Sequence, residues 1–212
     1  MTLVKICGLK EPEHANVAME AGTDFLGCVF FEPSPRNVSV EQAAEVFDMI
    51  GDSDVRSVGL FVNPDDAFLN KILHQVRLDI IQLHGQESPE RVEEVRQTYG
   101  LPVMKAMPIE TKADVESAKI YDGIADYLLF DAKPPKDATR PGGNALAFDW
   151  TLLSGTNWSV PWMLAGGLTV ENVKDAVKQS GARAVDVSSG VEIEKGVKSP
   201  EMIQAFIDAV KG

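Results

Sequence analysis

Eight short apolar runs, rich in residues that favour β-strands, recur along the chain at intervals of usually about 23 residues. Each is long enough for one strand, and its nearly continuous apolar character is typical of a parallel sheet buried on both faces. The runs are LVKIC from Leu3, FLGCVF from Phe25, SVGLFV from Ser57, IIQLH from Ile80, PVMKAM from Pro102, YLLFD from Tyr127, WMLAG from Trp162 and AVDVSS from Ala184. Their number and spacing constrain the fold more than any other feature of the sequence.

Amphipathic stretches with the periodicity of α-helices lie between these runs. Clear examples are VEQAAEVFDMI, PDDAFLNKILHQV, SPERVEEVRQTY and TVENVKDAVKQSG, and several open on a residue suited to capping. A strand followed by a helix, eight times in 212 residues, predicts a single-domain (β/α)8 TIM barrel spanning residues 1–212. The alternative is a doubly wound open sheet, which five or six strands would suit better than eight. We expect no linker and no second domain.

The connections between the predicted elements are unequal in length. Links from a helix to the next strand are brief, whereas FEPSPRNVS and DAKPPKDATRPGGNALAFDW follow predicted strands two and six as long irregular segments. Long loops without regular structure are usually lids or binding loops. Both fall at the carboxyl ends of strands, the face on which barrel enzymes carry their chemistry. We therefore predict the functional site there.

The charge of the chain limits its ligands. The formal net charge is −12, and the sequence contains no basic stripe of the kind that neutralises nucleic-acid phosphates. We therefore expect no nucleic-acid partner. An anionic small molecule would need a local concentration of backbone N–H groups or a few well-placed cations, because the field of the whole protein repels it.

Cysteine content and hydropathy indicate the compartment. The two cysteines are too few for a disulfide scaffold, and their spacing matches no metal-binding motif. The N-terminus lacks the basic-then-apolar pattern of a signal peptide, and no apolar run approaches the length of a membrane span. We expect a cytoplasmic protein with no metal ion and no membrane partner.

Cys7 ends the first apolar run and precedes Gly8. A free cysteine in that position is most often a small buried hydrophobe. Alternation along a strand, however, puts Lys5 on the same face as Cys7, and a neighbouring cation favours the thiolate, the form that acts as a base or nucleophile. Gly8 would allow another group to approach closely. Cys28 lies in the middle of a predicted strand, and we interpret it as a packing residue.

Asp131 lies at the start of one of the two long loops, and Arg36 lies within the other. Asp131 follows YLLF, so its carboxyl group should emerge at the top of strand six. A cap or turn role is the alternative, but a carboxyl group covered by a long loop can keep its proton and serve as a general acid. Arg36, in PSPRNV, follows two prolines that stiffen its loop, and a guanidinium fork suits a carboxylate. We predict that it binds an anion.

Glycine-containing turns follow the last two predicted strands, in LAGGLTVENV and DVSSGVE. Such turns can present bare N–H groups where barrel enzymes commonly hold a phosphate, although two ordinary tight turns would look the same. Asp186 alternates with apolar residues and is predicted to face inward with Lys5 as its partner. His84, in QLHGQES, lies near the same face, and we interpret it as a capping or loop histidine.

Taken in order, these motifs closely resemble one family over the whole length of the chain. KICGL, SPRNV, LFVN, QLHG, LLFD, FDW, LAGGL and DVSSGVE together resemble the phosphoribosylanthranilate isomerases of tryptophan biosynthesis. The resemblance implies an Amadori rearrangement of a small phosphoribosyl substrate, with no metal and no cofactor, in a protein that is a monomer or a homodimer.

The same resemblance assigns roles to individual residues. It implies that Cys7 is the general base, that Asp131 is the general acid, and that Arg36 holds the anthranilate carboxylate. Asp186 is placed among the substrate-binding residues. The turns that contain Gly166 and Gly167, and Ser189 and Gly190, match the phosphate site of the family.

Two other readings remain. Related phosphosugar barrels, the histidine-pathway isomerase and indole-glycerol-phosphate synthase, are similar to this pattern, but the former uses aspartate at the position of Cys7 and the latter relies on lysine and glutamate. A catalytically silent barrel that binds a phosphorylated ligand is the second. Its support is PGGNALAFDW, where Asn144 and Ala145 replace the hydroxyl residue and third glycine usual in the family. Ala145 would resist a positive φ that glycine accepts.

Overall fold

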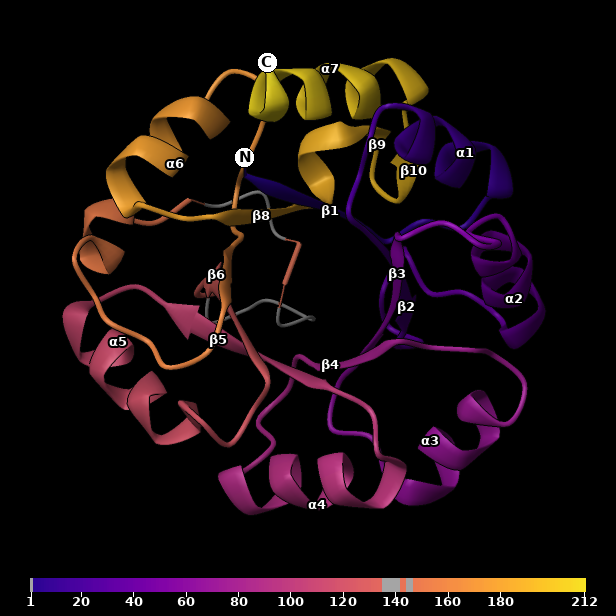
Figure 1. Ribbon diagram of the computed structural model, residues 1–212, viewed down its shortest axis with the longest axis horizontal. Coiled ribbons are helices and arrows are strands. Elements are labelled where there is room, and N and C mark those ends of the chain that lie inside the picture. The colour runs from indigo at the N-terminus through magenta and orange to yellow at the C-terminus, as the bar shows by residue number, and fades with distance from the viewer. Residues whose placement is uncertain (1, 135–141, 144–146) are drawn as a thin grey trace.

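Eight parallel strands close into a barrel surrounded by helices in the computed structural model, which describes residues 2–134, 142–143 and 147–212 (Figure 1). Neighbouring strands follow chain order, and β1 pairs with β8 to close the ring. The strands are β1 (Leu3–Cys7), β2 (Phe25–Phe30), β3 (Arg56–Phe61), β4 (Ile80–Leu83), β5 (Val103–Ile109), β6 (Tyr127–Ala132), β7 (Trp162–Leu164) and β8 (Ala184–Val187). The predicted barrel is confirmed, and each predicted apolar run overlaps one of its strands.

Seven α-helices pack outside the barrel in the described part of the chain. They are α1 (Pro12–Glu20), α2 (Val40–Asp48), α3 (Asp66–Leu73), α4 (Pro89–Tyr99), α5 (Lys112–Ala118), α6 (Val173–Ser180) and α7 (Pro200–Lys211). Several begin at a side chain that accepts a hydrogen bond from an N–H group of the first turn: Ser39, Asp65, Ser88, Thr111 and Ser199. Within the described residues, no helix has both the length and the apolar character needed to cross a membrane.

The expected repeat of strand and helix has irregularities at two positions. Between β6 and β7, the described residues form only the 3₁₀ helix η2 (Trp150–Leu153), which Asp149 caps. After β8 the chain enters the 3₁₀ helix η3 (Ser189–Val191) and then an antiparallel hairpin, β9 (Glu192–Glu194) and β10 (Val197–Lys198), before α7. Another 3₁₀ helix, η1 (Lys119–Tyr121), follows α5.

Side chains on the two faces of the strands form separate cores. One cluster fills the barrel interior, and a larger one lies between the barrel and the helices. Interior positions include Phe25, Val58, Ile80, Met104, Leu129 and Met163. Cys28 belongs to the outer core with no exposed surface, and its Sγ lies 3.4 Å from the Leu9 carbonyl oxygen. Its interpretation as a packing residue is confirmed.

An aspartate pairing repeats at the amino-terminal end of the barrel. In each case an aspartate just before an even-numbered strand accepts a hydrogen bond from a backbone N–H of the preceding odd-numbered strand. The pairs are Asp24 with Val4 at 2.8 Å, Asp79 with Ser57 at 2.8 Å and Asp126 with Val103 at 2.9 Å. These contacts lie away from the carboxyl ends of the strands, so we assign them to stability.

We expect Asp79→Ala to lower the free energy of unfolding by roughly 1–3 kcal/mol, because it removes the acceptor of the buried Ser57 N–H and one of the two acceptors of the Ser57 hydroxyl. Urea unfolding measures the change. Asp52→Ala, at an exposed turn, is the matched control. Equal stability of the two variants would contradict this assignment.

Candidate active site

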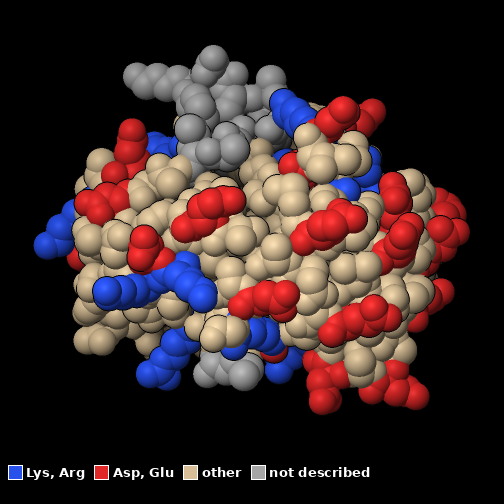
Figure 2. All heavy atoms as spheres, turned by 90° about the horizontal axis from the view of Figure 1, so that it is seen from above, with Lys and Arg blue, Asp and Glu red and all other residues tan. Residues whose placement is uncertain are grey.

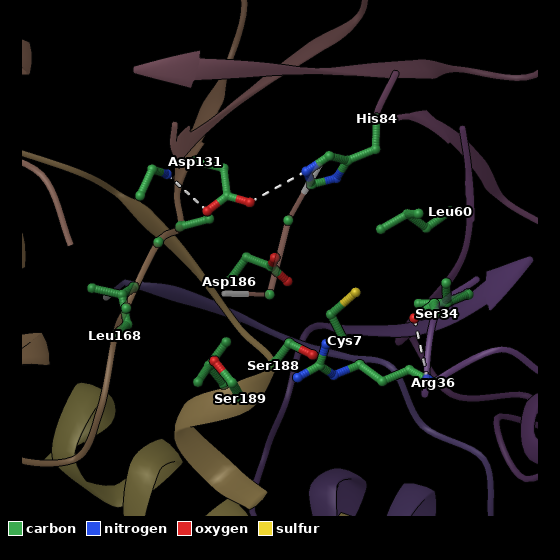
Figure 3. A pocket seen from close by; sticks show the side chains of 18 of the residues that line it. Cys7, Ser34, Arg36, Leu60, His84, Asp131, Leu168, Asp186, Ser188 and Ser189 are labelled. Carbon is green, nitrogen blue, oxygen red and sulfur yellow. Dashed lines mark hydrogen bonds and ion pairs between the residues drawn. The ribbon is translucent and has the colours of Figure 1, made fainter. Parts of the chain in front are cut away.

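A pocket opens at the carboxyl ends of the strands, the face predicted from the loop lengths. It gathers side chains from distant parts of the chain (Figure 3). Of the residues predicted for the site, those lining the pocket are Cys7, Arg36, Asp131, Gly166, Gly167, Asp186 and Ser189. Gly190 packs beneath it: a Cβ there would lie 1.8 Å from the Leu168 carbonyl oxygen. The sequence therefore predicted the face on which the pocket opens, and seven of the eight predicted site residues line it.

Cys7 ends β1 with its sulfur turned into the pocket, and Lys5 lies one layer below. The register of β1 with β8 sets Lys5 opposite Asp186, and Lys5 Nζ lies 2.8 Å from Asp186 Oδ1. The predicted partnership is confirmed. Burial lowers the pKa of Lys5, but the Asp186 carboxylate outweighs burial, so that the net pKa is raised and Lys5 stays charged.

The expected thiolate is not the favoured form of Cys7 in the empty pocket. Cys7 is 3% exposed, and burial raises the pKa of its thiol above the ordinary value. The positive charges of Lys5 and Lys198 act in the opposite direction but do not outweigh burial. The sequence revealed the neighbouring cation, whereas the depth at which the sulfur is buried emerged only from the folded chain.

Asp131 points into the pocket from the end of β6 and contacts His84 (Figure 3). Its Oδ1 accepts the Ala132 N–H at 2.8 Å, and its Oδ2 lies 3.2 Å from His84 Nε2. Our interpretation of His84 as a capping or loop histidine is wrong, because the ring lines the pocket and pairs with Asp131. The alternation of the strand could have indicated this, because Ile80, Gln82 and His84 are two residues apart and therefore point to the same side.

Gln82 contacts the ring of His84. Its Nε2 lies 3.0 Å from His84 Nδ1, and His84 Nε2 is the ring nitrogen that faces Asp131. The Gln82 side chain has no exposed surface, and its Oε1 has no hydrogen-bond partner among the described residues. The buried amide therefore orients the ring, and the ring nitrogen that carries the proton depends on which amide atom faces Nδ1.

Arg36 reaches the pocket from the loop after β2. Its Nε and Nη2 donate to Glu192 Oε1 and Oε2 at 2.7 and 2.8 Å, a bidentate pair in which each side chain is 4% exposed. Gly8, with φ of +78°, allows this approach, since a Cβ there would lie 2.6 Å from Arg36 Cδ. The group expected to pass close to Gly8 is therefore the side chain of Arg36.

Glu192 and Lys198 hold Arg36 in place, and sequence reasoning missed both. Lys198 Nζ contacts Glu192 Oε1 and the Ser188 carbonyl oxygen, each at 2.8 Å. Burial raises the pKa of Glu192, but Arg36 and then Lys198 outweigh it and lower the pKa to about 2. Burial lowers the pKa of Lys198 to about 8, although Glu192 acts against it. The run EIEKGVK could have indicated a hairpin, but nothing in it indicates that Glu192 pairs with Arg36.

The glycine turns lie across the pocket from Arg36. Gly166 and Gly167 have φ of +86° and +63°, and a Cβ on Gly166 would lie 2.6 Å from the Ala132 nitrogen. Figure 3 shows Leu168 and Ser189 on one side of the pocket and Ser34 and Arg36 on the other, with Cys7 and Asp131 between them. The arrangement gives one end of a ligand a guanidinium, the other end a backbone-rich cradle, and the middle an opposed thiol and carboxyl group.

The described residues around the pocket offer no metal site, and part of the loop after β6 adjoins the pocket. Among the described residues, no group of three His, Cys, Asp or Glu side chains is placed to hold a metal ion. The departure from the family pattern at Asn144 and Ala145 lies outside the described residues. Gly142 and Gly143, beside this segment, line the pocket, and a Cβ on Gly143 would lie 2.4 Å from Arg36 Nη1.

Comparison with known proteins places this chain among barrels of one kind. The sequence model of the family described as N-(5'phosphoribosyl)anthranilate (PRA) isomerase matches residues 4–209. The N-(5'-phosphoribosyl)anthranilate isomerase of Paramagnetospirillum magneticum is 56% identical over 209 residues, which are 99% of this chain and 97% of that protein.

Two solved structures carry the comparison to three dimensions. Phosphoribosyl anthranilate isomerase of Thermotoga maritima superposes with a TM-score of 0.88 at 34% identity, covering 100% of each chain. A phosphoribosyl anthranilate isomerase in complex with reduced 1-(o-carboxyphenylamino)-1-deoxyribulose 5-phosphate superposes with a TM-score of 0.85 at 32% identity, again over 100% of each chain.

We expect Glu192→Gln to remove a pH-dependent part of the stability. Because the folded pKa of Glu192 is lowered to about 2, its contribution is fully present above the ordinary pKa of 4.5 and is lost as pH falls from there toward about 2. The variant should be less stable than the wild type by roughly 2–3 kcal/mol at pH 7, and the difference should shrink below pH 4.5. Urea unfolding at a series of pH values measures it; a difference independent of pH would contradict the assignment.

Proposed function

The chain belongs to the N-(5'-phosphoribosyl)anthranilate isomerase family, and we propose that Cys7 is the general base and Asp131 the general acid of its isomerisation of N-(5'-phosphoribosyl)anthranilate. The observation that carries this proposal is that one pocket contains the side chains of both residues, and that Arg36 and the turn at Gly166 and Gly167 line the same pocket. The family works in tryptophan biosynthesis. We infer a cytoplasmic enzyme, where the free thiols of Cys7 and Cys28 stay reduced.

The first chemical step is opening of the ribose ring. Asp131 protonates the ring oxygen, and the lone pair of the anilino nitrogen expels that oxygen to form a protonated imine at C1'. The carboxyl group lies where His84 can hold it in one orientation through the 3.2 Å contact with Oδ2. General acid catalysis of this kind contributes roughly 10²–10⁴-fold to a rate.

The second step is removal of the proton from C2' by the Cys7 thiolate. Electrons of the broken C–H bond form the C1'–C2' double bond and neutralise the iminium, giving an enolamine that tautomerises to 1-(2-carboxyphenylamino)-1-deoxyribulose 5-phosphate. Burial disfavours the thiolate in the empty pocket. The iminium created in the first step adds a positive charge beside the sulfur, in the same sense as Lys5 and Lys198.

The proton balance requires a reset in each cycle. Asp131 gives one proton to the sugar and Cys7 takes one from it, so turnover ends with a thiol and a carboxylate. The next cycle needs the proton returned from sulfur to carboxylate. The reaction is an internal redox isomerisation, in which C1' is reduced and C2' is oxidised, so the electrons balance with no cofactor and no metal.

The two ends of the substrate are held by different means. Arg36 binds the anthranilate carboxylate, for which the guanidinium fork is suited, and the turns at Gly166, Gly167, Ser189 and Gly190 bind the phosphate through backbone N–H groups. Asp186 lines the pocket while its Oδ1 is held by Lys5, and we place its carboxylate against the sugar hydroxyl groups. Phosphate binding through neutral backbone suits a protein with a net charge of −12.

We expect Cys7→Ser and Asp131→Asn each to lower kcat by at least about 10²-fold, because each removes one proton-transfer group. The unstable substrate is generated in place from anthranilate and phosphoribosyl pyrophosphate with the transferase, and loss of its fluorescence measures turnover. Circular dichroism and thermal unfolding check that the fold persists. Near-native turnover in a folded variant would reject the role of that residue.

The proposed role of Arg36 in binding the substrate carboxylate can be tested separately. Arg36→Lys keeps the positive charge but loses the bidentate fork, so KM should rise about tenfold or more while kcat changes less. The same fluorescence assay gives both constants. Unchanged KM in the folded variant would show that Arg36 does not bind the anthranilate half of the substrate.

A further inference from the structure

The hairpin β9–β10 places two charged side chains behind the substrate pocket. Glu192 begins β9 and Lys198 ends β10, and neither lines the pocket itself. Lys198 is 2% exposed at its side chain, and its ammonium group contacts Glu192 Oε1 at 2.8 Å, the Ser188 carbonyl oxygen at 2.8 Å and Ser188 Oγ at 3.2 Å. A buried lysine with this many partners needs a reason beyond packing, since burying a charge is costly.

The balance of charges around Arg36 gives such a reason. Arg36 is paired through two hydrogen bonds with Glu192, and such a pair is neutral overall. Lys5 and Asp186 form a second neutral pair on the adjacent strands. A carboxylate brought up to two neutral pairs would gain little attraction to offset its desolvation. Lys198 shares the Glu192 carboxylate and so leaves this connected group of charges with one positive charge in excess.

The contacts of Lys198 also join the two ends of the site. Through Glu192 it fixes the guanidinium proposed to hold the substrate carboxylate, and through Ser188 it fixes the residue before Ser189 in the phosphate turn. Ser188 Oγ in turn lies 3.1 Å from where a Cβ on Gly8 would stand, next to Cys7. One ammonium group thus supports Arg36, the turn at Ser189 and the surroundings of the Cys7 thiol.

We propose that Lys198 is a positioning residue that supplies the net positive charge on which both substrate carboxylate binding at Arg36 and formation of the Cys7 thiolate depend. It acts through Glu192 and Ser188 without touching the substrate. The inference rests on the proposed function, because it assumes that Arg36 receives a carboxylate and that Cys7 is the base.

The test compares Lys198→Met, which keeps the apolar stem and removes the charge, with Lys198→Arg, which keeps the charge. Lys195→Met, at the exposed tip of the same hairpin, is the matched control. We expect Lys198→Met to raise KM by at least about tenfold, Lys198→Arg to recover most of that loss, and Lys195→Met to behave as the wild type. Unchanged KM in a folded Lys198→Met variant would overturn the inference.

A double variant separates charge from packing. In Glu192→Gln with Lys198→Met, Arg36 keeps its charge with no opposing carboxylate, so the excess positive charge returns. KM of the double variant should therefore fall back toward the wild-type value, compared with Lys198→Met alone. A merely structural role for Lys198 predicts the reverse, because the double variant has lost more contacts, and a higher KM in the double variant would count against our proposal.

Alkylation of Cys7 gives a readout without substrate. Iodoacetamide reacts with the thiolate, and Cys28 contributes little because it has no exposed surface and burial raises the pKa of its thiol. Because the pKa of Lys198 is about 8 whereas arginine stays charged, the pH at which Cys7 becomes reactive should be highest in Lys198→Met and lowest in Lys198→Arg. Absence of wild-type turnover would refute the proposed function, whereas normal turnover with an unshifted alkylation profile would refute only the inference about Lys198.

Discussion

Closure of the sheet between β1 and β8 is the constraint on which the rest of the structure depends. The pairing aligns Lys5 with Asp186, residues 181 positions apart in the chain, and joins their side chains at 2.8 Å. It also brings Cys7, at the end of the first strand, next to the segment that follows the last one. Because that segment turns into the hairpin β9–β10, the same closure delivers Glu192 to Arg36 from 156 positions away. The pocket is thus a consequence of the ring being complete.

The charges of this pocket differ from those of the molecule around it. Acidic side chains are spread over the face shown in Figure 2, and the chain carries a net charge of −12. Inside, Lys5, Arg36 and Lys198 are shared between two carboxylates, so the local balance is positive. Buried groups are poorly screened by salt, so this local charge acts on a ligand more strongly than surface charges do. An acidic protein can in this way accommodate a substrate that carries both a carboxylate and a phosphate.

The thiol and the carboxyl group illustrate how environment divides two proton-transfer roles. Burial raises the pKa of Cys7 and favours its thiol form, while His84, oriented by Gln82, contacts Asp131; in the mechanism that we propose, the iminium formed by ring opening is the cation that draws the proton from the thiol. A base that becomes effective only after ring opening would couple the two steps of the reaction. The stability of the barrel, by contrast, draws on the aspartate contacts at the opposite end, as expected where one face carries chemistry and the other does not.

The sequence by itself determined the barrel, because eight apolar runs at regular spacing leave few ways to bury every strand, and it placed Cys7, Asp131 and Arg36 on one face through strand alternation and loop length. Local patterns carry that information. What only the tertiary structure decided was which charges meet: the Arg36–Glu192–Lys198 group, the His84–Asp131 contact and the burial that raises the pKa of Cys7. Each depends on contacts between residues far apart in the chain and on the loss of solvent around them when the chain folds. Neither effect can be read from a short stretch of sequence.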